Sequence, residues 1–433
     1  MKKYSEYKDS GVEWIGEIPS HWNVKKLKFT SDLNNTKLDN SKFNEYIGLE
    51  HVQSFSGKLL HYGNSSELDS KVNSVFYKNN VLFGKLRPYL TKCIVAETDG
   101  VCSDEFLVLK PNEIKPKFLQ YIMLSKLFIE LVNSSTYGAK MPRASWDFIG
   151  NIEISYPSID EQIKITNYLD SKISQMEELI SKKEELIETL KVSKTKLISE
   201  TVTKGLDKHV PMKDSGIEWI GEIPSHWELK KIKHCIDSNI GGFWGEDPKG
   251  NENDVSCIRV SEFIKEKCLL KDVELTIRNI PKNKFNQIKV KKGSILIEKS
   301  GGGETCLVGN AVIVNDNLNA VYSNFITKIE VKNTLNPFFI NYMLRCMYLK
   351  GVNYLCINQT TGIQNLNTSK YLSEYISIPS KYEQDKIVNF LDKKTSQIDS
   401  LVEKVKEQIE LLKEAKQKLI TEVVTGKIDV TDL

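Results

Sequence analysis

The chain has few of the features that mark a membrane, secreted or metal-binding protein. No run of about 18 apolar residues occurs, so the sequence predicts no membrane span. The first residues, Met1-Lys2-Lys3, are followed by polar and acidic residues instead of the apolar stretch of a signal peptide. Eight cysteines are scattered without a CxxC pair, and none of the six histidines lies near such a pair. We therefore expect a cytoplasmic protein with reduced, mostly buried thiols and no bound metal.

Sequence signals of catalysis are also sparse. Asn336-Pro337-Phe338-Phe339 lacks the second proline of an NPPY motif, and no glycine-rich cofactor loop precedes it. The glycines at 301–303 are followed by Glu-Thr, where a phosphate-binding P-loop has Gly-Lys-Ser/Thr. Asp followed by Glu-x-Lys, a spacing of metal nucleases, occurs at 99–115 and 316–332, but a chain with 27% charged residues produces it by chance. We expect no catalytic centre.

A duplicated block is the most informative feature of the sequence. Residues 8–28, KDSGVEWIGEIPSHWNVKKLK, recur as residues 213–233, KDSGIEWIGEIPSHWELKKIK, with 17 of 21 positions identical. A second block, YPSIDEQIKITNYLDSKISQMEEL from residue 156, recurs as IPSKYEQDKIVNFLDKKTSQIDSL from residue 378. The first pair is offset by 205 residues and the second by 222, so the blocks enclose segments of unequal length.

The enclosed segments, residues 29–155 and 234–377, differ in sequence but share an outline. Each has short apolar strands, then a helix opened by proline, then a polar loop that contains glycine. The expected helices are PKFLQYIMLSKLFIELV in the first segment and PFFINYMLRCMYLKGV in the second. Repeated ends around differing interiors suggest a fixed scaffold that carries two readers of different targets.

A long helix with a coiled-coil seam is predicted after each middle segment. The first seam contains Ile173, Met176, Ile180, Ile187, Leu190 and Leu197, interrupted by Lys183, Lys194 and Thr201. The second contains Ile398, Val402, Val405, Ile409, Leu412, Leu419 and Val423, interrupted by Thr395 and Lys416. About 40 residues at 1.5 Å each give roughly 60 Å. We expect antiparallel pairing within the chain, an approximate two-fold relation between the repeats, and neighbouring termini. Pairing between two copies of the chain is the alternative.

This arrangement resembles the specificity subunits of type I restriction-modification systems over nearly the whole chain. The resemblance is carried by WIGEIPSHW at 14–22 and 219–227, YPSIDEQ at 156–162, IPSKYEQ at 378–384 and LFGKLRPYL at 82–90. It implies two target-recognition domains that each read one half of a split, asymmetric site on double-stranded DNA. It also implies two methyltransferase subunits that modify adenine and ATP-driven restriction subunits that cleave. S-adenosylmethionine, ATP and Mg would belong to these partners, with no cofactor in this chain.

The expected fold is α+β, with two recognition domains of similar plan joined by two long antiparallel helices. The boundaries place the first recognition domain at 1–155 and the first long helix at 156–207. The second recognition domain is placed at 208–377, and the second long helix at 378–433. The second domain departs from the LRPY pattern, because KSGGG at 299–303 stands where KLRPY stands at 85–89.

Candidate DNA contacts come from polar loops after strands and helices, because Arg, Lys, Asn and Gln reach base edges while hydroxyls and backbone amides hold phosphates. In the first domain they are Lys85, Arg87, Tyr89, Lys140, Arg143 and Ser145. In the second they are Lys299, Ser300, Gly302, Asn358, Gln359, Thr360, Thr361 and Gln364. Trp14, Trp22, Trp219 and Trp227 could stack on bases, but their place in the repeated blocks favours packing against the scaffold.

The chain is nearly neutral, with a net charge of +3, and neither middle segment is strongly basic. We therefore expect modest DNA affinity from this chain alone. Two other functions stay open, an assembly scaffold whose middle segments bind proteins and a stand-alone nuclease.

Overall fold

The computed structural model describes residues 2–68, 72–138, 140–302, 307–360 and 363–431. These form two compact units. Unit 1 combines Met1–Glu185 with Val405–Leu433, and unit 2 is the continuous segment Leu186–Lys404. Two long helices, α5 (Ile159–Lys204) and α9 (Lys381–Val424), each begin in one unit and end in the other.

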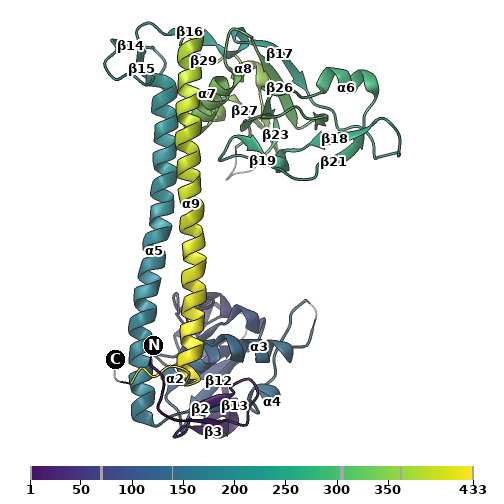
Figure 1. The fold of residues 1–433 in the computed structure, drawn as a ribbon. Coiled ribbons are helices and arrows are strands. Elements are labelled where there is room, and N and C mark those ends of the chain that lie inside the picture. Colours follow the sequence, from purple (N-terminus) through teal and green to yellow (C-terminus); the bar gives the residue numbers. More distant parts are fainter. Residues whose placement is uncertain (1, 69–71, 139, 303–306, 361–362, 432–433) are drawn as a thin grey trace. The chain divides into compact units, whose positions relative to one another are not determined.

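Unit 1 contains an antiparallel sheet, a mixed sheet and two short strand pairs, and its strands lie beside the ends of the long helices (Figure 1). The four-stranded sheet has the order β10 (Cys93–Val95), β9 (Val81–Gly84), β12 (Phe106–Pro111) and β4 (Ser31–Leu33). The five-stranded sheet has the order β5 (Lys37–Asp39), β8 (Val72–Phe76), β11 (Gly100–Cys102), β6 (Glu45–Ile47) and β7 (Gly63–Asn64). The remaining pairs are β1 (Tyr7–Asp9) with β2 (Glu17–Pro19), and β3 (Asn23–Lys26) with β13 (Glu153–Tyr156).

Unit 2 has a similar plan, with its strands divided differently among the sheets. Its six-stranded sheet has the order β17 (Ile236–Gly241), β26 (Ile326–Val331), β22 (Ile295–Glu298), β24 (Ala311–Ile313), β20 (Leu269–Leu270) and β19 (Phe263–Ile264). Two three-stranded sheets follow, β21 (Thr276–Asn279), β18 (Asp254–Ile258) and β25 (Ala320–Tyr322), then β23 (Ser300–Gly301), β28 (Ile363–Leu366) and β27 (Ile357–Thr360). The pairs are β14 (Met212–Asp214) with β15 (Glu222–Pro224), and β16 (Glu228–Lys231) with β29 (Tyr375–Ile378).

Short helices complete both domains. Unit 1 has α1 (Leu27–Thr30), α2 (Pro116–Leu124), α3 (Lys126–Ser134) and α4 (Trp146–Ile149), and unit 2 has α6 (Lys282–Ile288), α7 (Pro337–Leu349) and α8 (Thr368–Tyr371). The helix expected in the second segment is confirmed as α7. The one expected in the first segment is divided into α2 and α3, because Ser125 is extended (ψ 144°) and its hydroxyl donates to the Ile122 carbonyl at 2.6 Å.

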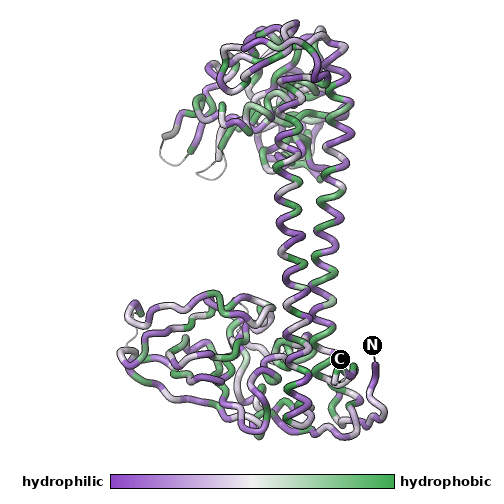
Figure 2. Tube along the Cα trace, turned by 90° about the vertical axis from the view of Figure 1, so that its left-hand side faces the viewer, coloured by the Kyte–Doolittle hydropathy of each residue, from purple (hydrophilic) through white to green (hydrophobic). Residues whose placement is uncertain are grey.

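The long helices pair antiparallel within each unit. In unit 1, Lys183 Nζ on α5 donates to Gln408 on α9 at 2.7 Å, while Glu177 and Lys416 lie 3.2 Å apart. Apolar residues recur along both helices between hydrophilic ones (Figure 2). The predicted seam is confirmed, since Ile173, Ile187, Val405 and Ile409 are each at most 7% exposed. Each helix thus has its coiled-coil partner inside the chain.

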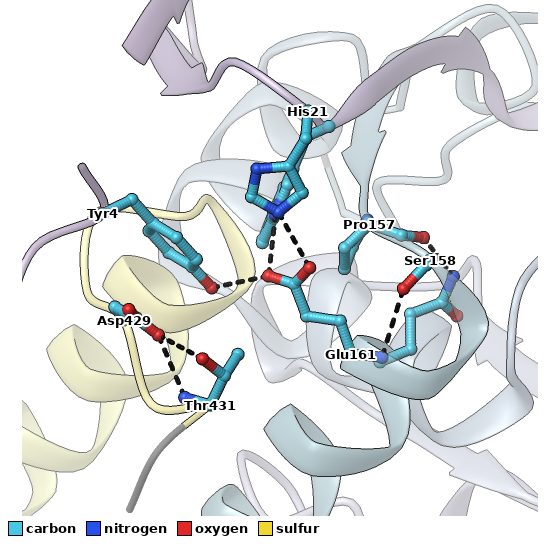
Figure 3. Close-up of polar contacts among 9 residues, drawn as sticks. Tyr4, His21, Pro157, Ser158, Glu161, Asp429 and Thr431 are labelled. Carbon is cyan, nitrogen blue, oxygen red and sulfur yellow. Dashed lines mark hydrogen bonds and ion pairs between the residues drawn. The ribbon is translucent and has the colours of Figure 1, made fainter. Parts of the chain in front are cut away.

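The repeated N-terminal block anchors the first domain on the start of α5. Figure 3 shows the Glu161 carboxylate facing His21, whose Nε2 lies 2.9 Å away, and Tyr4, whose hydroxyl donates at 2.8 Å. The buried indole of Trp22 donates to the same carboxylate at 3.0 Å. Burial and the hydrogen bond to Glu161 raise the pKa of Tyr4 above its ordinary value. The prediction that Trp22 packs on the scaffold is therefore confirmed.

The second copy of the block makes the corresponding contacts at the start of α9. His226 Nε2 lies 2.9 Å from Glu383, and the buried Trp227 indole donates to that carboxylate at 3.4 Å. Ser380 also donates to Glu383 at 2.9 Å. Burial opposes ionisation of Glu383, but these donors hold its pKa below the ordinary value. The repeated residues of the sequence are thus the contacts that hold each domain on its helix.

Glutamines of the repeated EQ pairs join each domain helix to its long helix. Gln162 accepts from the Lys115 amide at 2.8 Å and donates to the Pro157 carbonyl at 2.9 Å. Gln384 accepts from the Asn336 amide and donates to the Pro379 carbonyl at the same distances, 2.8 and 2.9 Å. Each glutamine caps the segment just before α2 or α7, so the strand-to-helix turn is fixed in both domains.

The chain termini lie close together in unit 1, as the sequence predicts (Figure 1). The Asp429 amide donates to the Lys2 carbonyl at 2.9 Å, and the Tyr7 hydroxyl donates to the Lys427 carbonyl at 3.4 Å. Gly426, with φ +73°, passes Pro19 so closely that a Cβ there would lie 2.4 Å from it. The segment after α9 therefore closes against the first repeated block.

Candidate nucleic-acid interface

Two loops that the sequence predicts separately are paired in the first domain. Leu86, beyond the end of β9, forms a bridge with Arg143. The Arg87 amide donates to the Pro142 carbonyl at 2.7 Å, and the Ala144 amide donates to the Lys85 carbonyl at 3.0 Å. The candidates Lys85 and Arg87 therefore lie beside the 140–145 candidates on one surface.

Arg87 combines an unusual backbone conformation with an exposed side chain. Its backbone is left-handed, with φ 51° and ψ 60°, and it precedes Pro88 at the start of a 3-10 helix, Pro88–Leu90. Such a backbone is strained for a residue with a Cβ, and strain of this kind collects at functional sites. The chain has five arginines, all in the described part, and Arg87 alone makes no side-chain hydrogen bond or ion pair to another described residue. Its exposed guanidinium is available for a ligand.

The other candidates of the first domain differ in whether their side chains bind other residues of the chain. Arg143 makes a bidentate contact with Glu105, with Nη2 at 2.6 Å and Nε at 3.1 Å, and this hydrogen bonding raises the pKa of Arg143. The Ser145 hydroxyl accepts from the Phe148 amide and caps α4. Both side chains order the loop. Tyr89 is 44% exposed and Lys140 is exposed, so these two can reach a ligand directly.

The candidates of the second domain meet in one small sheet. Ser300 and Gly301 of β23 pair with Asn365 and Gln364 of β28, and β28 pairs with β27 through Asn358, Gln359 and Thr360. Lys299 closes the sheet, because its carbonyl accepts from the Leu366 amide at 2.8 Å. Segments 58 to 65 positions apart are thus brought together, which the sequence does not reveal.

The sheet exposes some of these side chains and buries others. Asn358 is exposed, and Gly302 has φ +67° at the end of β23. Gln364 is 4% exposed and its Oε1 accepts from the Val308 amide at 3.3 Å, which favours a structural role. Thr361 lies outside the described residues.

Two polar residues beside these surfaces were missed by the sequence reasoning. Asn365 accepts from Ser300 Oγ at 2.5 Å on the same sheet. Tyr137 is 63% exposed and exchanges two backbone hydrogen bonds with Arg143, at 3.1 and 3.0 Å. Alternation along IQNL would have placed Asn365 on the face opposite Gln364. Tyr137 opens the loop that already supplied Lys140 and Arg143.

Comparison with known proteins decides the family. A family model described as "Type I restriction modification DNA specificity domain" matches residues 19–189 and 224–411, which is most of the chain and includes both candidate surfaces. The chain belongs to the type I restriction-modification DNA specificity family. It is therefore a non-catalytic DNA-recognition subunit.

Relatives and solved structures agree with this assignment. The chain is 24% identical over 452 residues to the type I restriction enzyme MjaIX specificity subunit of Methanocaldococcus jannaschii, covering 99% of this chain and 98% of the relative. The MjaVIII specificity subunit of the same organism is 26% identical over 341 residues, 77% of this chain and 76% of the relative. A structure described as showing assembly and conformational transition of a type I R-M system matches with TM-score 0.74 at 20% identity, covering 95% of this chain and 99% of that one. The HsdS subunit from Thermoanaerobacter tengcongensis matches with TM-score 0.55 at 18% identity, covering 95% of this chain and 98% of that one.

The cysteines of this specificity subunit are buried thiols in the described part of the chain. Seven of its eight cysteines are described, and all seven are free and buried, as predicted, while Cys306 lies outside the described residues. Burial raises the pKa of the Cys102 thiol to about 12. Among the described residues, no three His, Cys, Asp or Glu side chains gather as metal ligands, and no helix is long and apolar enough to cross a membrane.

Proposed function

We propose that this specificity subunit reads a split, asymmetric DNA sequence, one half with each recognition domain, and so selects the site for its partner subunits. The observation that carries the proposal is the pair of unlike surfaces on similar domains. The first presents Arg87, Tyr89 and Lys140 on paired loops, and the second presents Asn358 and glycines on a three-stranded sheet. Different side chains on one plan would give the half-sites different sequences.

The partners follow from the family. Two methyltransferase subunits would modify adenine with S-adenosylmethionine, and ATP-dependent restriction subunits with Mg would cleave unmodified DNA. The assembly named for the structural neighbour supports such partners in general. This chain would supply no cofactor and would work in the cytoplasm. Its near-neutral charge, +3, supports an arrangement in which the partners provide much of the phosphate contact.

Genome-wide adenine methylation tests the proposal. Cells that express this chain with its methyltransferase should show one split, asymmetric motif that disappears when only this chain is removed. Replacing residues 29–155 with those of another family member should change one half-site and leave the other intact. Methylation that does not depend on the chain would contradict the proposal and favour the assembly scaffold. Cleavage of plasmid by the purified chain with magnesium would instead indicate a nuclease.

A further inference from the structure

Two of the lysines that interrupt the seams occupy equivalent places in the two repeats. Lys194 on α5 and Lys416 on α9 are 222 residues apart, the offset of the second repeated block. Each meets an acidic residue of the other long helix, Asp399 for Lys194 and Glu177 for Lys416. These acidic residues are also 222 residues apart. The chain therefore contains the same interhelix ion pair twice, once in each unit.

Both ion pairs are largely withdrawn from solvent. The side chains of Lys194 and Lys416 are 12% and 10% exposed. Lys194 Nζ lies 2.7 and 2.8 Å from the two oxygens of Asp399. Burial opposes ionisation of Glu177, but the hydrogen bond from Lys58 and the charge of Lys416 outweigh it, so the pKa of Glu177 lies below its ordinary value. A seam needs no such charges for stability, and buried polar groups in coiled coils commonly specify one arrangement.

The recognition domain of each unit also contacts the ion pair of that unit. In unit 1, Lys58 forms an ion pair with Glu177. In unit 2, Lys194 Nζ donates to the Glu266 carbonyl at 3.2 Å. Lys58 and Glu266 lie in equivalent turns, which the Val52 to Leu59 bridge closes in unit 1 and the β19–β20 pair closes in unit 2. We call Lys58, Glu177 and Lys416 the first seam cluster, and Lys194, Asp399 and the Glu266 carbonyl the second.

The domain helices α2 and α7 also form hydrogen bonds with these two turns. Gln120 Nε2 of α2 donates to the Gly57 carbonyl at 2.9 Å, and Asn341 Nδ2 of α7 donates to the Cys268 carbonyl at 3.4 Å. Gly57 has φ +71° and Cys268 has φ +57°, so the turns share an unusual backbone conformation. Each turn therefore links the body of its domain to a seam cluster.

Three contacts, spaced along α5, attach the first recognition domain to this helix. Gln162 holds the start of the domain helix, Asp170 accepts from Tyr121, and Glu177 holds the turn through Lys58. The separations of 8 and 7 residues correspond to about 12 and 10 Å along a helix. A body held only near one end can tilt about that end, whereas a third contact about 22 Å away along the helix resists tilting.

We propose that the seam clusters are positioning residues that hold each recognition domain at one tilt and so confine recognition to a single spacer length. This inference rests on the proposed reading of a split site. One base pair adds about 3.4 Å along the DNA axis. To reject a spacer that is one base pair longer or shorter, the subunit must therefore hold each reading loop to within about half of that distance, ~1.7 Å.

The experiment measures methylation of duplexes whose half-sites are separated by the natural spacer or by one base pair more or less. The half-sites come from the genome-wide motif, and the enzyme is the complex of this chain with its methyltransferase. Lys58→Met removes the link to the domain without leaving a buried lysine, since Lys58 is 59% exposed. Lys182→Met is the matched control, because Lys182 pairs with Glu178 on the exposed face of α5.

Lys58→Met should raise methylation of the altered spacers about tenfold relative to the natural one, the factor that ~1.4 kcal/mol of lost restraint gives. The bases read in each half-site should stay unchanged, which also shows that the domain is folded. Lys182→Met should keep the spacer preference of the natural chain. Unchanged discrimination in Lys58→Met would overturn the inference while leaving the proposed function intact. Absence of any split motif in the natural complex would overturn both.

Charge inversion tests the cluster as a unit. Glu177→Lys with Lys416→Glu keeps an interhelix pair but places Lys58 beside a second lysine, so spacer discrimination should weaken as in Lys58→Met. Adding Lys58→Glu restores both attractions to residue 177, and single-spacer methylation should return. Failure of the triple variant to recover, while it still reads both half-sites, would contradict the role of these charges.

Discussion

Glu161→Gln should loosen the first repeated block much more than Glu383→Gln loosens the second. Glu161 accepts from Tyr4, Trp22 and His21 at 2.8 to 3.0 Å, and its side chain is 12% exposed. Glu383 is 33% exposed, and its indole contact is longer, at 3.4 Å. The glutamine keeps one acceptor oxygen but removes the charge and turns an amide NH₂ toward donors.

The expected loss of stability follows from the hydrogen-bond donors that the substitution leaves without an ionised partner. A buried N–H without a partner costs about 1–3 kcal/mol, and losing the charge weakens each remaining bond by about 1 kcal/mol. We therefore expect about 2–4 kcal/mol for Glu161→Gln and about 1–2 kcal/mol for Glu383→Gln. Glu178→Gln, on the exposed face of α5, should leave the stability of this region unchanged, because an exposed ion pair contributes little.

Native-state hydrogen exchange is the suitable assay, because it reports local opening in a chain whose two units need not unfold together. The protection of residues 19–24 and 224–229 should fall in the respective variants. A double-mutant cycle with Trp22→Phe, which keeps the packing but removes the N–H, should give a coupling of about 1–2 kcal/mol. Equal losses in the two repeats, or no coupling with Trp22, would refute the reasoning.

Four further outcomes follow. Arg87→Ala should weaken DNA binding by the complex, and the slope of log affinity against log salt should fall by about 1 if the guanidinium holds a phosphate; an unchanged binding isotherm would exclude the contact. The stabilisation from Glu177 is present above its ordinary pKa of 4.5 and is lost as the pH falls through its lowered value, so acid unfolding of unit 1 should become less steep in Glu177→Gln. Gly426→Ala should destabilise the chain by more than the about 1–2 kcal/mol of a left-handed backbone, whereas Gly11→Ala, with nothing within 4 Å of its Cβ, should cost only that amount in urea unfolding. Cys102 should react with iodoacetamide only on unfolding, because its thiol is buried with a pKa of about 12; fast labelling of the native chain, read by mass spectrometry, would contradict this.

The periodic parts of the fold could be predicted because they repeat a local pattern. The seam residues of both long helices follow heptad spacing, and heptad spacing alone places Ile173 and Ile409 inside. The break at Ser125 could not be predicted, since a serine inside an apolar helix signals a bend only when the tertiary structure selects it. Helix propensity alone therefore does not predict the break at Ser125.

The candidate interface was predictable as a set of loops but not as an arrangement. The pairing of Leu86 with Arg143 and of Ser300 with Asn365 joins segments distant in the sequence, and no local rule gives such registers. For the same reason, the sequence does not show which candidate side chains bind other residues of the chain. Arg87 and Arg143 look alike in the sequence, yet Glu105 holds only Arg143.

The composition of the units affects how the chain folds as it is synthesised. Unit 2 is continuous, so all its residues have been synthesised once Lys404 is made. Unit 1 also needs Val405–Leu433, and Asp429 follows Glu185 by 244 residues (429 − 185). At about 5–20 residues per second the first 185 residues wait roughly 12–50 s for their last segment. Synthesis of unit 1 therefore begins first and is completed last, and its apolar surface waits for the C-terminal segment before it can be buried.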